Sequence, residues 1–88
     1  MKVIYKYHIA VADKQEIDLP DDYEILCVQV QKGNVCLWVK HASEKYAPRC
    51  NCKILMYGTG HLMSHGEGEY IGTVQLDDGN LVLHVFEG

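Results

Sequence analysis

The sequence predicts an all-β domain, either a small antiparallel β-barrel or a β-sandwich of six to seven short strands. Apolar and polar residues alternate along most of the chain, which is the period of a half-buried strand. Clusters of turn-forming residues at 32–34 and 77–80 separate the alternating stretches. No stretch has the apolar spacing of a long amphipathic helix, and several short strands with regular turn signals are typical of barrels and sandwiches.

The first half of the chain predicts one strand, a short return strand and a hairpin. The first strand is expected over residues 2–11, because alternate residues are apolar on one face: Val3, Tyr5, Tyr7, Ile9 and Val11. Asp13 and Lys14 indicate a turn, residues 15–19 a return strand, and Pro20 a break. Residues 23–41 predict a hairpin that turns at 32–34. Both of its faces are partly apolar, so we expect it to be central and covered on both sides.

The second half predicts three further strands. Residues 41–49 are polar and indicate a loop or a single helical turn. Residues 52–57 predict a strand, followed by a glycine-rich stretch. Residues 70–76 and 81–87 form the clearest hairpin, with Asp78 and Gly79 at its turn.

Length and composition indicate a single folded domain over residues 1–88. The chain is 48% hydrophobic and 23% charged, which provides enough apolar surface to offset the entropy of ordering the chain. A chain of this size buries only about 60–65% of its unfolded surface. Its sheet edges also need protection, which favours closure into a barrel or pairing with a second copy as a homo-oligomer.

Charge and hydropathy exclude several classes of partner. The formal charge of −4 lacks the basic footprint that neutralises phosphates, so we expect no nucleic-acid partner. No run approaches the eighteen apolar residues of a membrane-spanning helix, and the N-terminus lacks the apolar core of a signal peptide. We therefore expect a cytoplasmic protein without a membrane partner, whose four cysteines are reduced thiols.

Residues 50–70, CNCKILMYGTGHLMSHGEGEY, raise the question of a metal site. Zinc prefers thiolate and imidazole ligands, and four are present: Cys50, Cys52, His61 and His65. The Cys-x-Cys spacing fits poorly, since residues i and i+2 of a strand lie roughly 6.6 Å apart. Two sulfurs on one zinc must come within about 4 Å of each other. Buried cysteine behaves as a small hydrophobe. We expect core thiols with no metal or cofactor, and a zinc-stabilised module is the alternative.

The turn YGTGH at 57–61 is the predicted binding site for a ligand or partner. Tyr57 would offer a stacking surface, Gly58 and Gly60 a close backbone approach, and Thr59 and His61 hydrogen bonds. The pattern is neither a dinucleotide-binding fingerprint nor a P-loop. The competing hypothesis is a mobile connection without a binding role.

A further alternative is a small enzyme with His61 as its acid or base. Glu67 and Glu69 could supply carboxylates, and Cys50 or Cys52 a thiol. Nothing in the sequence completes a set of nucleophile, base and orienting group, so we predict no catalytic residue. His84 lies in a predicted strand, where a structural role is expected.

Six short motifs resemble an uncharacterised family of small proteins, a domain of unknown function encoded by tailed bacteriophages and prophages. They are IYKY at 4–7, ILCVQVQ at 25–31, VCLW at 35–38, YGTGH at 57–61, YIGTVQ at 70–75 and HVFE at 84–87. Cys50 and Cys52 are not part of this pattern. The resemblance implies a phage accessory protein in the bacterial host cytoplasm and provides no catalytic residues. The resulting hypothesis is a non-catalytic protein that binds a host protein or small ligand, and by analogy inhibits a host defence system.

Overall fold

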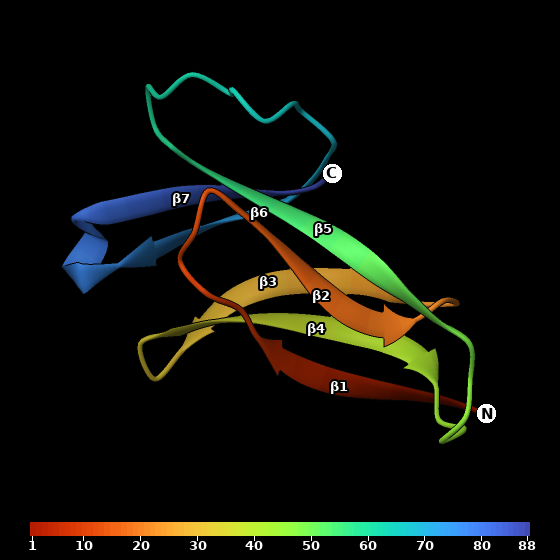
Figure 1. Ribbon diagram of the computed structural model, residues 1–88. Helices are drawn as coiled ribbons and strands as arrows, with labels where there is room; N and C mark the ends of the chain where they lie inside the picture. Colours follow the sequence, from red (N-terminus) through yellow and green to blue (C-terminus); the bar gives the residue numbers. More distant parts are fainter.

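A computed structural model describes all 88 residues as two antiparallel sheets packed face to face (Figure 1). Their strand orders are β1-β4-β3 and β2-β5-β7-β6. The elements are β1 (Lys2–His8), β2 (Lys14–Pro20), β3 (Glu24–Gln31), β4 (Asn34–Ala42), β5 (Arg49–Gly58), β6 (Glu69–Leu76), the 3-10 turn η1 (Asp77–Gly79) and β7 (Leu81–Glu87). The prediction of an all-β domain is confirmed. The sheets do not close, so the fold is a sandwich and not a barrel. None of its helical segments is long and apolar enough to cross a membrane.

The predicted hairpin at 23–41 is β3 and β4, joined by a two-residue turn. Lys32 and Gly33 have φ values of 52° and 79°, and Gln31 pairs with Asn34 across the turn. Two successive residues with positive φ match the twist of the flanking strands, which is why such turns close tight hairpins. Asn34 is therefore the first residue of the return strand.

The second predicted hairpin, β6 and β7, is also confirmed. Leu76 pairs with Leu81, and the connection between them includes Asp77, Asp78 and Gly79. All three of these residues have positive φ. Aspartate tolerates this conformation better than most residues with a Cβ, and glycine has no Cβ to clash.

Two expectations for the N-terminal segment are wrong. The first strand ends at His8, and Val11, which is 55% exposed, lies in the connection that leads to the other sheet. The short strand after it does exist as β2, but it pairs with β5 and does not return along β1. Alternation predicts which residues share a face, whereas the pairing partner depends on contacts distant in sequence.

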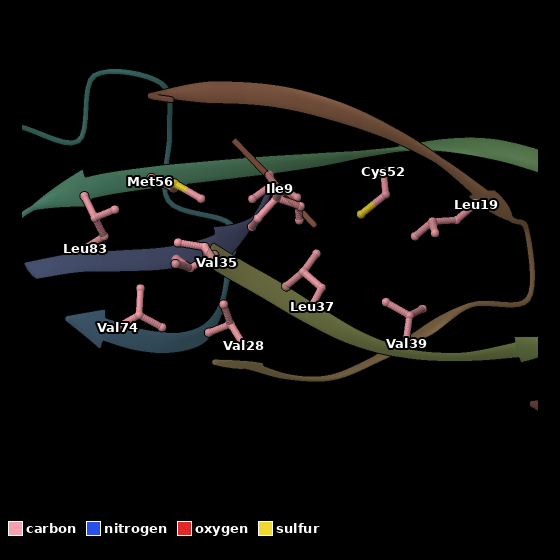
Figure 2. Close-up of a cluster of buried hydrophobic side chains, with 12 residues drawn as sticks. Ile9, Leu19, Val28, Val35, Leu37, Val39, Cys52, Met56, Val74 and Leu83 are labelled. Atoms are coloured by element: carbon pink, nitrogen blue, oxygen red, sulfur yellow. The ribbon is translucent and has the colours of Figure 1, made fainter. Parts of the chain in front are cut away.

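The core fills the space between the sheets (Figure 2). Alternate residues of the central strands β4 and β5 form its centre: Val35, Leu37, Val39, Cys52, Ile54 and Met56. Side chains from β2, β3, β6, β7 and the β1–β2 connection complete it: Leu19, Val28, Val74, Leu83, Val85 and Ile9. The strand alternation predicted from the sequence thus places one apolar row of each strand inside the sandwich.

The hairpin β3–β4 is not covered on both sides, contrary to expectation. All strands belong to the two sheets, so no third layer packs on the outer face of β4. There the Trp38 Nε1–H donates to Gln29 Oε1 at 3.0 Å, and Trp38 stays partly exposed. Cys36 is fully buried on this face. Apolar residues on the outer face of these strands are therefore shielded from water by neighbouring side chains of the same sheet.

The edges of the two sheets approach each other on one side only. β3 and β6 lie side by side although no backbone ladder joins them. One point of contact is Gly72 of β6, where a Cβ atom would lie 2.8 Å from Val28 Cγ1 of β3. A glycine at position 72 therefore lets the two edges pack together.

This contact predicts that Gly72→Ala destabilises the fold by about 1–3 kcal/mol, the usual cost of an inserted methyl group in packed surroundings. The same substitution in a Val28→Ala background should cost less, because the clashing methyl group is absent. Urea unfolding of the four proteins of this double-mutant cycle measures the coupling. Val30→Ala, also on β3, is the matched control and should be additive with Gly72→Ala. Additivity in the Val28→Ala background would refute the contact.

Candidate functional site

The predicted site lies at the end of β5, a strand with neighbours on both sides in its sheet. Because strand residues alternate, Met56 faces the core and Tyr57 faces the outer side of the sheet. From Gly58 the chain leaves the sheet and returns to β6 through residues 59–68, which we call the long loop (Figure 1). Every residue of the long loop is exposed.

The YGTGH segment forms a tight turn in which the two glycines have different roles. The His61 N–H donates to the Gly58 carbonyl oxygen at 3.1 Å. Gly60 has a φ of +84°, a conformation that side chains with a Cβ rarely adopt. At Gly58 a Cβ would lie 2.7 Å from the His61 ring, so the missing side chain lets the imidazole lie against the backbone.

Tyr57 does not offer the stacking surface predicted for it. Only 5% of the residue is exposed, and its ring lies edge-on to Phe86 with centroids 6.0 Å apart. Its hydroxyl group donates to the Gly66 carbonyl oxygen at 2.5 Å and accepts from the His65 N–H at 3.1 Å. Tyr57 is therefore an anchor that holds the long loop over the outer face of the sheet.

A chain of hydrogen bonds on this outer face was not predicted as part of the site. His84 of β7 contacts Thr59 Oγ1 through Nε2 at 2.7 Å and Thr73 Oγ1 through Nδ1 at 2.9 Å. Thr73 also bonds the Tyr70 hydroxyl at 2.7 Å. The register of the β6–β7 hairpin places Thr73 opposite His84, so the hairpin signal in the sequence could have located this pair. His84 links the turn to both strands.

Three hollows surround the turn, and Gly58 and His61 contribute to all of them. The one between the long loop and β7, which we call the loop hollow, has a volume of about 200 Å³. Its lining is Tyr57, Gly58, Thr59, Gly60, His61, Met63, His84 and Phe86. The second opens at the end of the sandwich near Met56 and measures about 150 Å³. The third lies beside Asn80 and measures about 230 Å³. Each is smaller than the roughly 300–1,000 Å³ of pockets that enclose a drug-sized ligand. One side chain or a small chemical group fits such a volume.

The four candidate zinc ligands are not brought together. Cys50 and Cys52 lie near the start of β5, whereas His61 and His65 follow its end. The six residues from Cys52 to Gly58 span about 20 Å of extended strand. No group of three or more His, Cys, Asp or Glu side chains has an arrangement that could hold a metal ion. In this arrangement Cys50, Cys52, His61 and His65 do not form one set of ligands.

The enzyme alternative also finds no support in the surroundings of His61. The exposed imidazole lies against Gly58 and has no hydrogen bond to a carboxylate or a thiol. Glu67 and Glu69 are exposed residues near the far end of the long loop. The turn thus presents the polar side chains of Thr59 and His61 to solvent.

A comparison with protein-family models supplies the family. The model described as Domain of unknown function (DUF7352) matches residues 1–88, the whole chain. The chain belongs to this family. Neither the curated proteins nor the solved structures that were searched include a match. Since the function of the DUF7352 domain is unknown, the family adds no residue roles to the site.

In this DUF7352 domain, Cys52 belongs to the core, as the alternation of β5 predicts. It is 1% exposed, and its sulfur lies 3.9 Å from Glu87 Oε2, which also accepts from the Tyr23 hydroxyl. Burial raises the pKa of the Cys52 thiol from 9.0 to about 11. The hydrogen bond to Glu87 raises the pKa of Tyr23 strongly as well. Cys52 is thus held neutral, and its contribution to stability falls as the pH rises from about 9 to about 11, since only the unfolded chain then ionises readily.

Removing the Tyr57 hydroxyl group should loosen the long loop. We expect Tyr57→Phe to lower the free energy of unfolding by about 1–2 kcal/mol, because two loop partners lose their hydrogen bonds. Hydrogen exchange should become faster over residues 63–67 and stay unchanged in β4. Tyr46→Phe is the control, since Tyr46 is 88% exposed and its hydroxyl group makes no hydrogen bond. Unaltered exchange in the loop after Tyr57→Phe would contradict the anchor.

The thiols should divide into two reactivity classes. Cys27 and Cys50 are half-buried, whereas Cys36 and Cys52 are buried. Under native conditions at mildly alkaline pH, iodoacetamide should label the first two, and the buried pair only when the chain opens. Peptide mass spectrometry over time measures this, and labelling in urea is the control for intrinsic reactivity. Equal native rates at Cys50 and Cys52 would show that the core placement is wrong.

Proposed function

We propose that this protein is a non-catalytic binding module that contacts its partner through the turn at 57–61. The supporting observation is that Gly58 and His61 border all three hollows of the molecule. Thr59, Gly60 and His61 are exposed at this point. Concave surface and exposed hydrogen-bonding groups thus coincide at one turn, and loops on rigid sheets are frequent binding sites.

The Tyr57 anchor supports a binding role over a mobile connection. A loop tied to its sheet through Tyr57 and Thr59 loses less conformational freedom on binding than a free one. The glycines at 58 and 60 have specific geometric roles in the turn, which a connection selected only for flexibility does not require.

The proposed partner is a host protein or a small ligand in a bacterial cytoplasm. This part of the proposal depends on the resemblance to phage and prophage proteins, whose small accessory products often act by binding. Inhibition of a host defence system is the corresponding role by analogy. Hollows of about 150–230 Å³ favour a single protein side chain over a large ligand.

The double variant Thr59→Ala/His61→Ala tests this site. It should retain the fold, because both residues are exposed and an exposed hydrogen bond contributes only about 1 kcal/mol. Proteins captured from a bacterial lysate by the tagged wild type should be lost or reduced about tenfold with the variant, as expected when contacts worth about 1.4 kcal/mol disappear.

The control is Glu24→Ala/Lys40→Ala, which removes an exposed ion pair from the other sheet and should capture the same proteins as the wild type. Thermal unfolding of each protein confirms the fold. Undiminished capture by Thr59→Ala/His61→Ala would remove the turn from consideration.

A further inference from the structure

Exposed apolar side chains lie on the long loop and near the starts of β6 and β7. Leu62 is 87% exposed, Tyr70 61%, Leu81 40% and Met63 38%. Met63 lines the loop hollow directly, and Tyr70 packs edge-on to its lining residue Phe86 at a centroid distance of 5.5 Å. Exposed aromatic residues and methionine beside a concavity are typical of the centre of a protein interface.

Charge is divided unequally along the chain. Residues 1–53 contain all eight lysines and arginines with seven acidic residues, a net charge of +1. Residues 54–88 contain five acidic residues and neither lysine nor arginine, a net charge of −5. These two values account for the total of −4. With histidines counted as neutral, the part of the chain that forms the turn, the long loop and the β6–β7 hairpin therefore has a net negative charge.

Four of these acidic residues are exposed and unpaired: Glu67, Glu69, Asp77 and Asp78. All four ion pairs of the molecule involve carboxylates of residues 1–53. The fifth acidic residue, Glu87, is partly buried and bonded to Tyr23. No internal cation therefore neutralises the exposed carboxylates.

The unpaired carboxylates lie on both sides of the surface that carries the exposed apolar residues described above. Asp77 and Asp78 precede Asn80, which lines the hollow beside Thr59. Glu67 and Glu69 lie near the C-terminal end of the long loop. They precede Tyr70, which pairs with Phe86 across the β6–β7 hairpin. The same sheet contains Lys14 in β2 and Lys53 in β5, and neither forms an ion pair with these carboxylates.

We infer that the surface formed by the loop hollow, the long loop and the β6–β7 turn binds a positively charged protein segment that places one apolar side chain in the loop hollow. This inference rests on the proposed function and names the chemistry of its partner. The carboxylates repel nucleic acids and small anions, and the hollow is too small for a large ligand. Lysine or arginine residues on both sides of an apolar anchor complement both the charge and the shape.

A short peptide is a direct probe of this chemistry. The acetylated and amidated peptide Lys-Lys-Gly-Leu-Gly-Lys-Lys should shift the backbone amide NMR signals of residues 59–70 and of His84. Its affinity should fall with added salt, because exposed charge pairs are screened. The counterpart with glutamate in place of lysine should cause no shift. The counterpart with glycine in place of leucine should bind more weakly.

The variant Glu67→Gln/Glu69→Gln/Asp77→Asn/Asp78→Asn should bind the lysine peptide about tenfold more weakly, the effect expected for several exposed charge pairs. Asparagine tolerates the positive φ at 77 and 78, so the turn should be retained. The matched control neutralises as many exposed carboxylates elsewhere: Glu16→Gln/Asp21→Asn/Glu24→Gln/Glu44→Gln. It should bind like the wild type.

Equal binding of the lysine peptide by the variant neutralised at residues 67, 69, 77 and 78 and by its matched control would overturn the inference. Amide NMR shifts confined to β1 and β4 would overturn it as well. Concentration-dependent shifts of residues 59–70 without peptide would assign the surface to a second copy of the chain and also overturn it. The lysate experiment separates the two proposals. Loss of capture with Thr59→Ala/His61→Ala but not with Glu67→Gln/Glu69→Gln/Asp77→Asn/Asp78→Asn leaves the proposed site in place and removes the positively charged partner.

Discussion

The packing of β4 against β5 is the contact on which the rest of the structure depends. Each of these strands has a hydrogen-bonded neighbour on both sides, so its backbone groups are satisfied within its own sheet. Their inward side chains are largely apolar, and Leu37 and Ile54 are completely buried. The buried polar exception, His41 of β4, forms a hydrogen bond with the Tyr7 hydroxyl. The strands at the sheet edges lack this double support. The long loop begins where β5 ends.

One strand thus serves two surfaces. Along β5, Met56 fills the core while Tyr57, the next residue, points to the opposite side of the sheet. A large aromatic ring on an outer face would normally contact water, and here the long loop covers it. The next residue, Gly58, begins the turn and lies at the boundary between the core and the outer face of the sheet. This explains why hollows form on both sides of His61.

The sequence predicted the features that depend on neighbours along the chain. Both hairpins were expected because Gly33 and Gly79 close their turns locally. The pairing of β2 with β5 was missed, since nothing in the alternation of β2 identifies a partner 29 to 41 residues away. The burial of Tyr57 was missed for a similar reason. It depends on the long loop folding back, which is a tertiary event that no local pattern encodes.

The sheet edges restrict the ways in which this fold can associate. β3 and β6 protect each other, which leaves β1 and β2 as the free edges. β1 contains Lys2 and Lys6, and β2 contains alternating charges and ends at Pro20. Charges and proline on edge strands oppose the addition of a further strand. Recognition through shared backbone ladders is therefore disfavoured, and contact surfaces must use side chains. Such surfaces can change partner by single substitutions while the two-sheet framework stays the same.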